Sequence, residues 1–167
     1  MDNTRTPVLY IVGNYNIDLV MGTLTHWPAQ GTEMMLEHSA LRPGGSAGNC
    51  ALAAAAMQLP HCTVGCQGDD AFTPWLAAQF PGGSARWPQY PCETSLTVAI
   101  THPNKERSFL SNHGHITRLT AGDVLSQLPA AAGEGDIVLL CGTFLCTGLL
   151  SDYPQLLATL RQRGFRS

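Results

Sequence analysis

Residues 43–49, Pro43-Gly44-Gly45-Ser46-Ala47-Gly48-Asn49, stand directly before an alanine-rich stretch that reaches Leu59. Adjacent glycines before a helix let backbone N–H groups face a ligand at the positive end of that helix. Glycine inside a helix costs about 1 kcal/mol relative to alanine, and asparagine also has a lower helix propensity. We therefore expect Gly48 and Asn49 to be present for contact with a ligand rather than for helix stability. A plain tight turn with Ser46 as the helix N-cap is the structural alternative.

A second polar pattern follows the first apolar run. Val8–Val12 is a short buried-type strand that ends at Gly13, and Asn16 and Asp18 come next. We expect both side chains at the C-terminal end of this strand, where ligands bind in open α/β sheets. An amide and a carboxylate two residues apart can donate to and accept from sugar hydroxyls, although an ordinary Asn/Asp turn explains the same residues.

The rest of the chain alternates strands with helices, which predicts an α/β fold with a parallel sheet. Segments 19–38 and 95–111 break the alternation and predict a small β lid; within the first, Thr32–His38 has strand character before the breaker at 42–45. Phe165–Ser167 should begin a further strand. The expected buried strands are 62–65 and 137–141, and the expected helices are 47–59, 69–80, 120–128 and 151–164.

Composition excludes several classes of protein. Lys plus Arg is 9 and Asp plus Glu is 12, which gives a net charge of −3, and there is no basic run for nucleic acid. We expect no membrane span, no signal peptide and a cytoplasmic protein. The six cysteines are expected to be reduced thiols. Neither Cys62 with Cys66 nor His113-Gly114-His115 has the spacing of a metal site.

Taken together, the patterns resemble the PfkB (ribokinase-like) carbohydrate kinases over residues 8–166. Asn16-x-Asp18-Leu19 is similar to the family's sugar-contacting start, and Gly44-Gly45-Ser46-Ala47-x-Asn49-x-Ala51 to its first signature. Residues 68–70 and 137–142, and the lid from Thr94-Ser95 onward, fit the same family. Gln58 replaces one signature glycine, and Ser46 replaces the lysine of ribokinase-like members.

The resemblance implies a ribokinase-like three-layer fold with a parallel central sheet and a small β lid, truncated after the N-terminal half. Residues 1–167 would be a partial kinase domain. It implies that Asn16, Asp18, Gly44, Gly45 and Asn49 hold the sugar. ATP and Mg²⁺ would serve the intact enzyme, which could form a homodimer through the lid. The catalytic Asp, its anion hole and most of the ATP site would lie in the other half.

Two glycine-rich segments imitate the family's Gly-Ala-Gly-Asp anion hole. Residues 120–123 open a surface helix, and residues 133–136 lead straight into a strand. An anion hole needs a glycine turn at a helix N-terminus, so we assign neither Asp123 nor Asp136 to catalysis. No residue of this chain is therefore predicted to be catalytic, and no metal site is predicted.

Two other hypotheses remain. Gly44-Gly45-x-x-Gly48 is near the fingerprint of a dinucleotide-binding oxidoreductase, but its first two glycines are adjacent and it does not follow the first strand. The chain could also be a kinase remnant without a function. ATP, NAD and sugar titrations would distinguish these hypotheses.

Overall fold

The computed structural model describes residues 5–167, and its centre is a three-stranded parallel sheet. Strand β1 (Leu9–Gly13) lies between β4 (His61–Val64) and β7 (Ile137–Cys141). Ile11 and Val12 are completely buried because helices cover both faces of β1. The predicted α/β fold with a parallel sheet is therefore confirmed.

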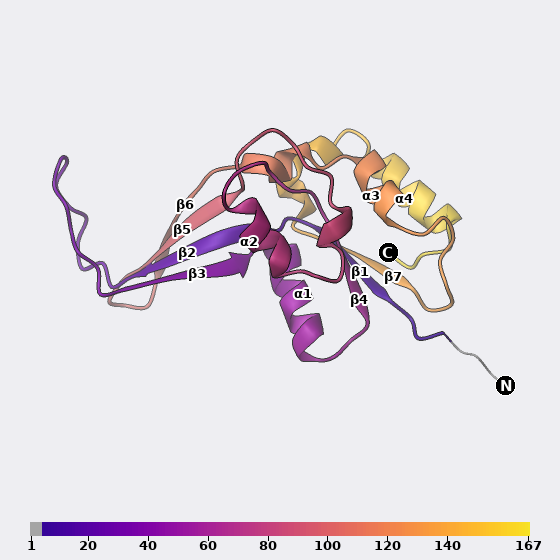
Figure 1. The fold of residues 1–167 in the computed structure, drawn as a ribbon, viewed down its shortest axis with the longest axis horizontal. Coiled ribbons are helices and arrows are strands. Elements are labelled where there is room, and N and C mark those ends of the chain that lie inside the picture. Colours follow the sequence, from indigo (N-terminus) through magenta and orange to yellow (C-terminus); the bar gives the residue numbers. More distant parts are fainter. Residues whose placement is uncertain (1–4) are drawn as a thin grey trace.

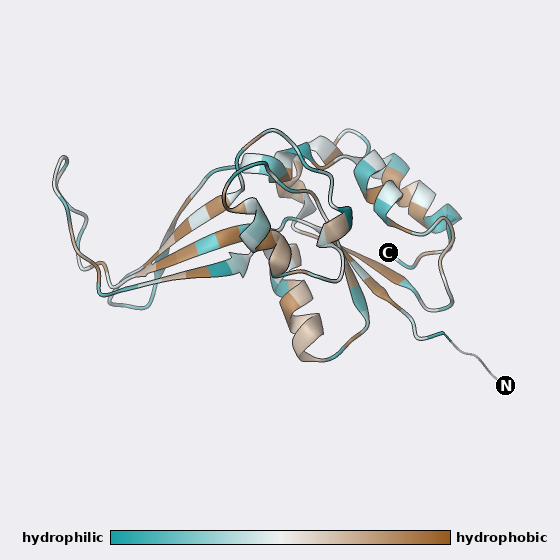
Figure 2. Cartoon of the chain, in the orientation of Figure 1, coloured by the Kyte–Doolittle hydropathy of each residue, from teal (hydrophilic) through white to brown (hydrophobic). Residues whose placement is uncertain are grey.

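Helices lie on both faces of this sheet (Figure 1). Helix α1 (Ser46–Ala56) covers one face, and the short helix α2 (Thr73–Ala78) packs into the same cluster. Helices α3 (Ala121–Gln127) and α4 (Tyr153–Gln162) cover the other face. In Figure 2 strands β1 and β7 are largely brown, whereas α3 and α4 carry both colours, as amphipathic surface helices do.

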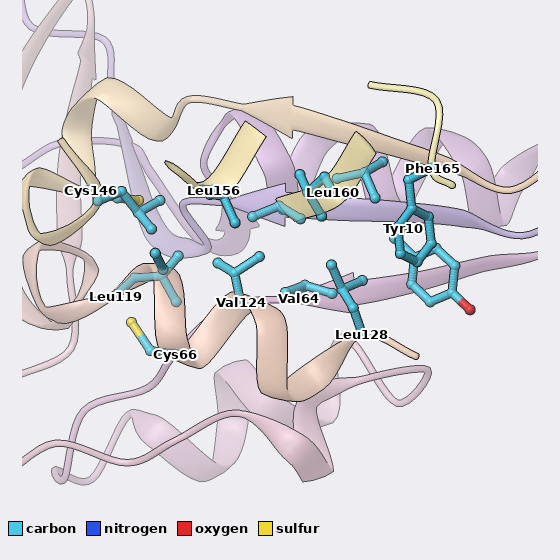
Figure 3. Packing of buried hydrophobic residues seen from close by; sticks show 14 of the residues in the cluster. Tyr10, Val64, Cys66, Leu119, Val124, Leu128, Cys146, Leu156, Leu160 and Phe165 are labelled. Atoms are coloured by element: carbon cyan, nitrogen blue, oxygen red, sulfur yellow. The ribbon is translucent and has the colours of Figure 1, made fainter. Parts of the chain in front are cut away.

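Alternate side chains of the strands divide the core into two clusters. Tyr10 and Val12 belong to the cluster under α3 and α4, together with Val124, Leu156 and Leu160, and the Tyr10 ring packs against Phe165 (Figure 3). Ile11 points the other way, toward the alanines of α1. Because the small alanine side chains bring α1 close to the sheet, the N-terminus of α1 lies beside the C-terminal ends of β1 and β7.

A second, mixed sheet forms the lid, which extends away from the main body at the left of Figure 1. Its strands β2 (Asn16–Gly22), β3 (His38–Gly44), β5 (Leu96–Thr101) and β6 (Arg107–Ser111) have the order β3-β2-β5-β6. Strands β2 and β5 are parallel, and the other two pairs are antiparallel. The predicted lid is confirmed, although it begins at Asn16 instead of residue 19.

The prediction of a strand at Thr32–His38 is wrong. Residues 32–37 have no strand, and β3 occupies His38–Gly44, including Arg42 and Pro43, which the sequence marks as a breaker. Proline is tolerated because β3 is an edge strand, where the missing N–H of Pro43 faces away from the ladder.

The remaining connections are short helical turns: η1 (Ser84–Arg86), η2 (Gly114–Arg118), η3 (Thr143–Leu145) and η4 (Thr147–Leu149). Past α4 the chain returns to the sheet, where Arg166 forms a parallel bridge with Ile137, as expected for the start of a further strand. Among residues 5–167, no helix has the length and apolar character needed to cross a membrane.

Candidate functional site

A cavity of about 380 Å³ opens where the base of the lid meets the N-terminus of α1. Its walls are mainly amide and hydroxyl side chains, with a single carboxylate and a few apolar groups. The lining residues are Asn14, Asn16, Asp18, Gly45, Ser46, Asn49, Ser95, Thr97, Phe109, Ser111, Asn112, His113, Ile116 and Leu145.

Four of the five sugar-contacting residues expected from the sequence line this one cavity: Asn16, Asp18, Gly45 and Asn49. The fifth, Gly44, lies directly behind it, because a Cβ added to Gly44 would overlap the Asp18 carboxylate. Strand pairing produces this arrangement, since Asn16 is opposite Gly44 in the β2–β3 ladder. Residues about 30 positions apart in the sequence thus meet at one point.

Asn16 and Asp18 lie in lid strand β2, which begins shortly after the C-terminal end of β1. Side chains two residues apart in a strand share a face, so both point into the cavity. The Asn16 Nδ2 donates a hydrogen bond of 2.8 Å to Asp18 Oδ1. Within the described part of the chain, no group donates to Asp18 Oδ2, which leaves this oxygen available to a ligand hydroxyl.

The Asp18 carboxylate is partly removed from water. Burial raises the pKa of Asp18 above its ordinary value, and the hydrogen bond from Asn16 and the positive charge of Arg107 oppose this rise. A partly desolvated carboxylate makes stronger hydrogen bonds to a ligand than a fully hydrated one. Asp18 is thus suited to accept hydrogen bonds from hydroxyl groups.

The turn at Gly45 requires glycine for two reasons. Its backbone has φ 85° and ψ 156°, a conformation that side chains disfavour. In addition, a Cβ at this position would collide with the main-chain carbonyl of Asn14 and with the Asn16 amide oxygen. The close approach brings Gly45, the N-cap residue of α1, against the β1–β2 turn.

Asn14 is a central residue that the sequence analysis missed. Its Oδ1 accepts a hydrogen bond of 3.0 Å from the Ser46 N–H, and its main-chain carbonyl accepts one of 3.3 Å from Gly48. We expected the N–H groups of this turn to face a ligand, but Asn14 already satisfies these two. Its place in the polar segment after Gly13 was the available signal.

The lid contributes a second group of side chains that the sequence analysis did not select. Thr97 lies opposite Asp18 on β2 and opposite Ser111 on β6 in the lid sheet, and Thr97 Oγ1 is 2.9 Å from Ser111 Oγ. Phe109, two residues before Ser111, is 60% exposed and lines the same cavity. The polar side chains at alternate positions Ser95 and Thr97 were the signal for this face.

His115 supports the cavity from behind. It is fully buried, its Nδ1 accepts a hydrogen bond of 3.0 Å from the Ser95 N–H, and its Nε2 lies 3.1 Å from the Tyr15 carbonyl. Because Nδ1 must accept, the proton lies on Nε2 and the ring is neutral. Burial lowers the pKa of His115 to about 4, against smaller opposing effects of Tyr15 and Asp70.

The two segments that resemble an anion hole, residues 120–123 and 133–136, have structural roles. Asp123 forms a capping box with Thr120 at the start of α3 and accepts a hydrogen bond of 2.7 Å from Tyr90. The Asp136 carboxylate is tied to Arg5 and to the N–H groups of Val8 and Gly133. Both carboxylates lie outside the lining of the cavity. Within residues 5–167, no three His, Cys, Asp or Glu side chains converge in the way metal ligands do.

Solved structures of sugar kinases share this fold. Ribokinase from Giardia lamblia matches 95% of this chain and 47% of its own, with 20% identity and a TM-score of 0.66. Arabidopsis thaliana ribokinase, solved with ribose and ATP, matches 96% of this chain and 52% of its own, with 17% identity and a TM-score of 0.66. A fructokinase from Xylella fastidiosa with bound ATP matches 72% of this chain and 38% of its own, with 20% identity and a TM-score of 0.55.

These matches concern the fold, since all three identities are at or below 20%. The chain spans about half the length of the two ribokinases that it matches. No protein-family model matches the sequence, and no curated protein does. The chain therefore has the ribokinase-like α/β fold, with a parallel sheet and a lid of mixed strands.

Proposed function

We propose that this chain is the sugar-binding part of an ATP-dependent carbohydrate kinase of the PfkB family. The observation that carries the proposal is the single cavity into which Asn16, Asp18 and Asn49 converge, beside the hydroxyl-bearing face of the lid. The fold shared with ribokinases and a fructokinase supports it. The substrate is a sugar or a sugar-like molecule with several hydroxyl groups.

The polar groups of the cavity suit such a substrate. The free oxygen of Asp18 accepts from a hydroxyl group, and the amide of Asn49 can both donate and accept. Beside Asp18 in the same lid sheet, Thr97 and then Ser111 offer further hydroxyls, while Phe109 presents an exposed ring to the apolar C–H face of a sugar. Binding here would fix the orientation of the substrate, which is the main contribution that a protein makes to phosphoryl transfer.

The described residues do not fit Mg²⁺ or the phosphates of ATP. Residues 5–167 show no convergent group of metal-ligating side chains, and the sequence has no Gly-x-x-x-x-Gly-Lys-[Ser/Thr] loop. We therefore derive no step that involves ATP or Mg²⁺ for these residues. The proposal places the nucleotide site and the catalytic base on residues outside 1–167, and treats 1–167 as a partial domain of a cytoplasmic enzyme that dimerises through its lid.

Calorimetric titration of the chain with ribose, fructose and nucleosides tests the binding proposal. One of these ligands should bind, and Asp18→Ala should weaken its affinity roughly ten- to a hundred-fold, since a hydrogen bond to a charged group is worth about 1.5–3 kcal/mol. Asp69→Ala, a change at a carboxylate outside the cavity lining, should leave the affinity unchanged. The proposal fails if no sugar or nucleoside binds, or if Asp18→Ala binds as well as the unaltered chain.

An assay of ATP turnover tests the assignment of catalysis. Without a catalytic base, the purified chain should show no sugar-dependent hydrolysis or transfer of the γ-phosphate. Turnover in a sample free of host kinases would contradict the assignment.

A dinucleotide-binding function has less support. The glycine pair lies at the end of lid strand β3, whose last residue is Gly44, whereas the first turn of a dinucleotide site would follow a strand of the parallel sheet. Titration with NAD in the same calorimeter should therefore give no heat of binding.

A further inference from the structure

Two thiols meet directly behind the wall of the cavity. Cys50 lies in α1, and Cys141 is the last residue of β7. Their sulphur atoms are 3.3 Å apart, although the two residues are separated by 91 positions in the sequence. Both residues are half-buried, which leaves a small oxidant a path to the pair.

The pair joins two segments that shape the cavity. Cys50 directly follows Asn49, which lines the cavity, and Cys141 directly precedes Gly142. Gly142 packs so closely that a Cβ there would collide with the Asn14 amide and with the Ser46 side chain. A covalent link between the two sulphurs would therefore lock the first turns of α1 to the end of β7.

We propose that Cys50 and Cys141 form a reversible dithiol–disulfide site, which hydrogen peroxide or glutathione disulfide oxidises. With peroxide, the Cys50 sulphur attacks one oxygen, the O–O bond breaks, and a sulfenic acid and one water result. The Cys141 sulphur then attacks the sulfenic sulphur, an S–S bond forms, and a second water leaves with the Cys141 proton. Each disulfide thus consumes one peroxide. With glutathione disulfide, the Cys50 sulphur attacks one sulphur of the oxidant and releases one glutathione, and the Cys141 sulphur then attacks the Cys50 sulphur of the mixed disulfide and releases the second. A reducing thiol restores both S–H groups.

The order of the two steps follows from the surroundings of Cys141. Burial and the contact with Cys50 raise the pKa of the Cys141 thiol to about 11, so this thiol is protonated at neutral pH. The thiolate is the reactive form of cysteine, and the first oxidation is therefore assigned to Cys50. The protein holds four further cysteines: Cys62, Cys66, Cys92 and Cys146. Of these, Cys62, Cys66 and Cys146 are buried, and burial raises the pKa of Cys146 to about 12.

Thiol counting under denaturing conditions tests the proposal on the purified chain. After treatment with a glutathione disulfide buffer, the titratable thiols should fall from six to four, because one disulfide consumes two. The intact mass should fall by two hydrogen atoms, and dithiothreitol should reverse both changes. Cys50→Ser and Cys141→Ser should each abolish the loss of mass, whereas the matched variant Cys92→Ser, also at a half-buried cysteine, should retain it.

A second probe does not depend on oxidation or on a folded variant. Phenylarsine oxide bridges two thiols that lie within reach of one arsenic atom, and it should bind the unaltered reduced chain at one equivalent and protect Cys50 and Cys141 from alkylation. The proposal is overturned if the oxidised chain keeps all six thiols, or if peptide mapping finds the disulfide or the arsenical at other cysteines. These readouts need no sugar and no ATP, so they are independent of the proposed function.

Discussion

At the scale of single residues, the cavity depends on one partly desolvated carboxylate. Asp18 receives a hydrogen bond from Asn16, but burial still raises its pKa. A raised pKa in the folded state means that the ionised carboxylate disfavours folding at every pH above that pKa, and that this penalty disappears as the pH falls below it. The charge of Asp18 therefore favours ligand binding but lowers the stability of the fold.

Replacement of Asp18 by asparagine tests the effects of this charge on stability and on binding separately. Asp18→Asn removes the desolvated charge but keeps an acceptor oxygen for Asn16, so the melting temperature at pH 7 should stay the same or rise by a few degrees. Sugar affinity should fall roughly ten-fold or more, because a neutral acceptor makes weaker hydrogen bonds than a carboxylate. Thermal melts and calorimetry measure the two effects, and a large loss of stability would show that the charge supports the fold.

Gly45 offers a second prediction at this scale. Gly45→Ala should destabilise the chain by about 2 kcal/mol or more, because it combines an unfavourable backbone conformation with overlap against Asn14 and Asn16. Gly31 is a matched control, since its φ is 80° but nothing lies within 4 Å of an added Cβ. Gly31→Ala should cost only the conformational part, about 1 kcal/mol. Equal losses in urea unfolding would mean that the close approach at Gly45 contributes nothing.

At the scale of elements, His115 joins the lid to the main body. Its ring accepts from Ser95 just before β5 and donates to Tyr15 just before β2. Protonation of Nδ1 would remove the acceptor for the Ser95 N–H and leave a buried charge. The two lid strands that enter the cavity are therefore held by a histidine that must stay neutral.

The pH dependence of unfolding tests this role. Because the folded-state pKa of His115 is lowered to about 4, its contribution to stability is complete above the ordinary pKa near 6.5 and is lost as the pH falls toward 4. The free energy of unfolding should decrease in this range by up to about 1.4 kcal/mol per pH unit. His115→Gln should flatten this slope, whereas His38→Gln, at an exposed lid position, should not. A slope that survives in His115→Gln would assign the titration to another group.

The sequence predicted elements whose signals are local. Asp123 three residues after Thr120 gave the capping box of α3, and Gly164 ends α4 with φ 86°. Prediction from the sequence failed where pairing between distant segments decides the structure. Strand β3 exists because Arg42 and its neighbours pair with β2, and no local pattern distinguishes this edge strand from a turn. The roles of Asn14 and Thr97 likewise depend on contacts between distant segments.

At the scale of the whole molecule, strand β7 has an unusual surface. Val138 and Leu140 pack toward α3 and α4, but Ile137 and Leu139 on the opposite side of the strand are 42% and 37% exposed. Among the described residues, the outer edge of β7 is bridged only through Arg166. Buried parallel strands are normally covered on both faces, so this face and edge are open to another surface.

We therefore expect residues 1–167, as an isolated chain, to self-associate and to unfold with low cooperativity. The exposed apolar side chains of β7 and its open N–H and C=O groups are a template for pairing with another copy. Leu139→Lys should increase the monomer fraction in size-exclusion chromatography, because a charge on this face opposes burial. Met35→Lys is the matched control, since Met35 is 83% exposed in the loop that precedes β3, and it should leave the elution profile unchanged.

A sharp monomer peak from the unaltered chain, with cooperative unfolding in the mesophile range of about 45–65 °C, would contradict the prediction. That result would mean that the exposed face of β7 is stable in water, and it would remove the main physical support for treating these residues as a partial domain.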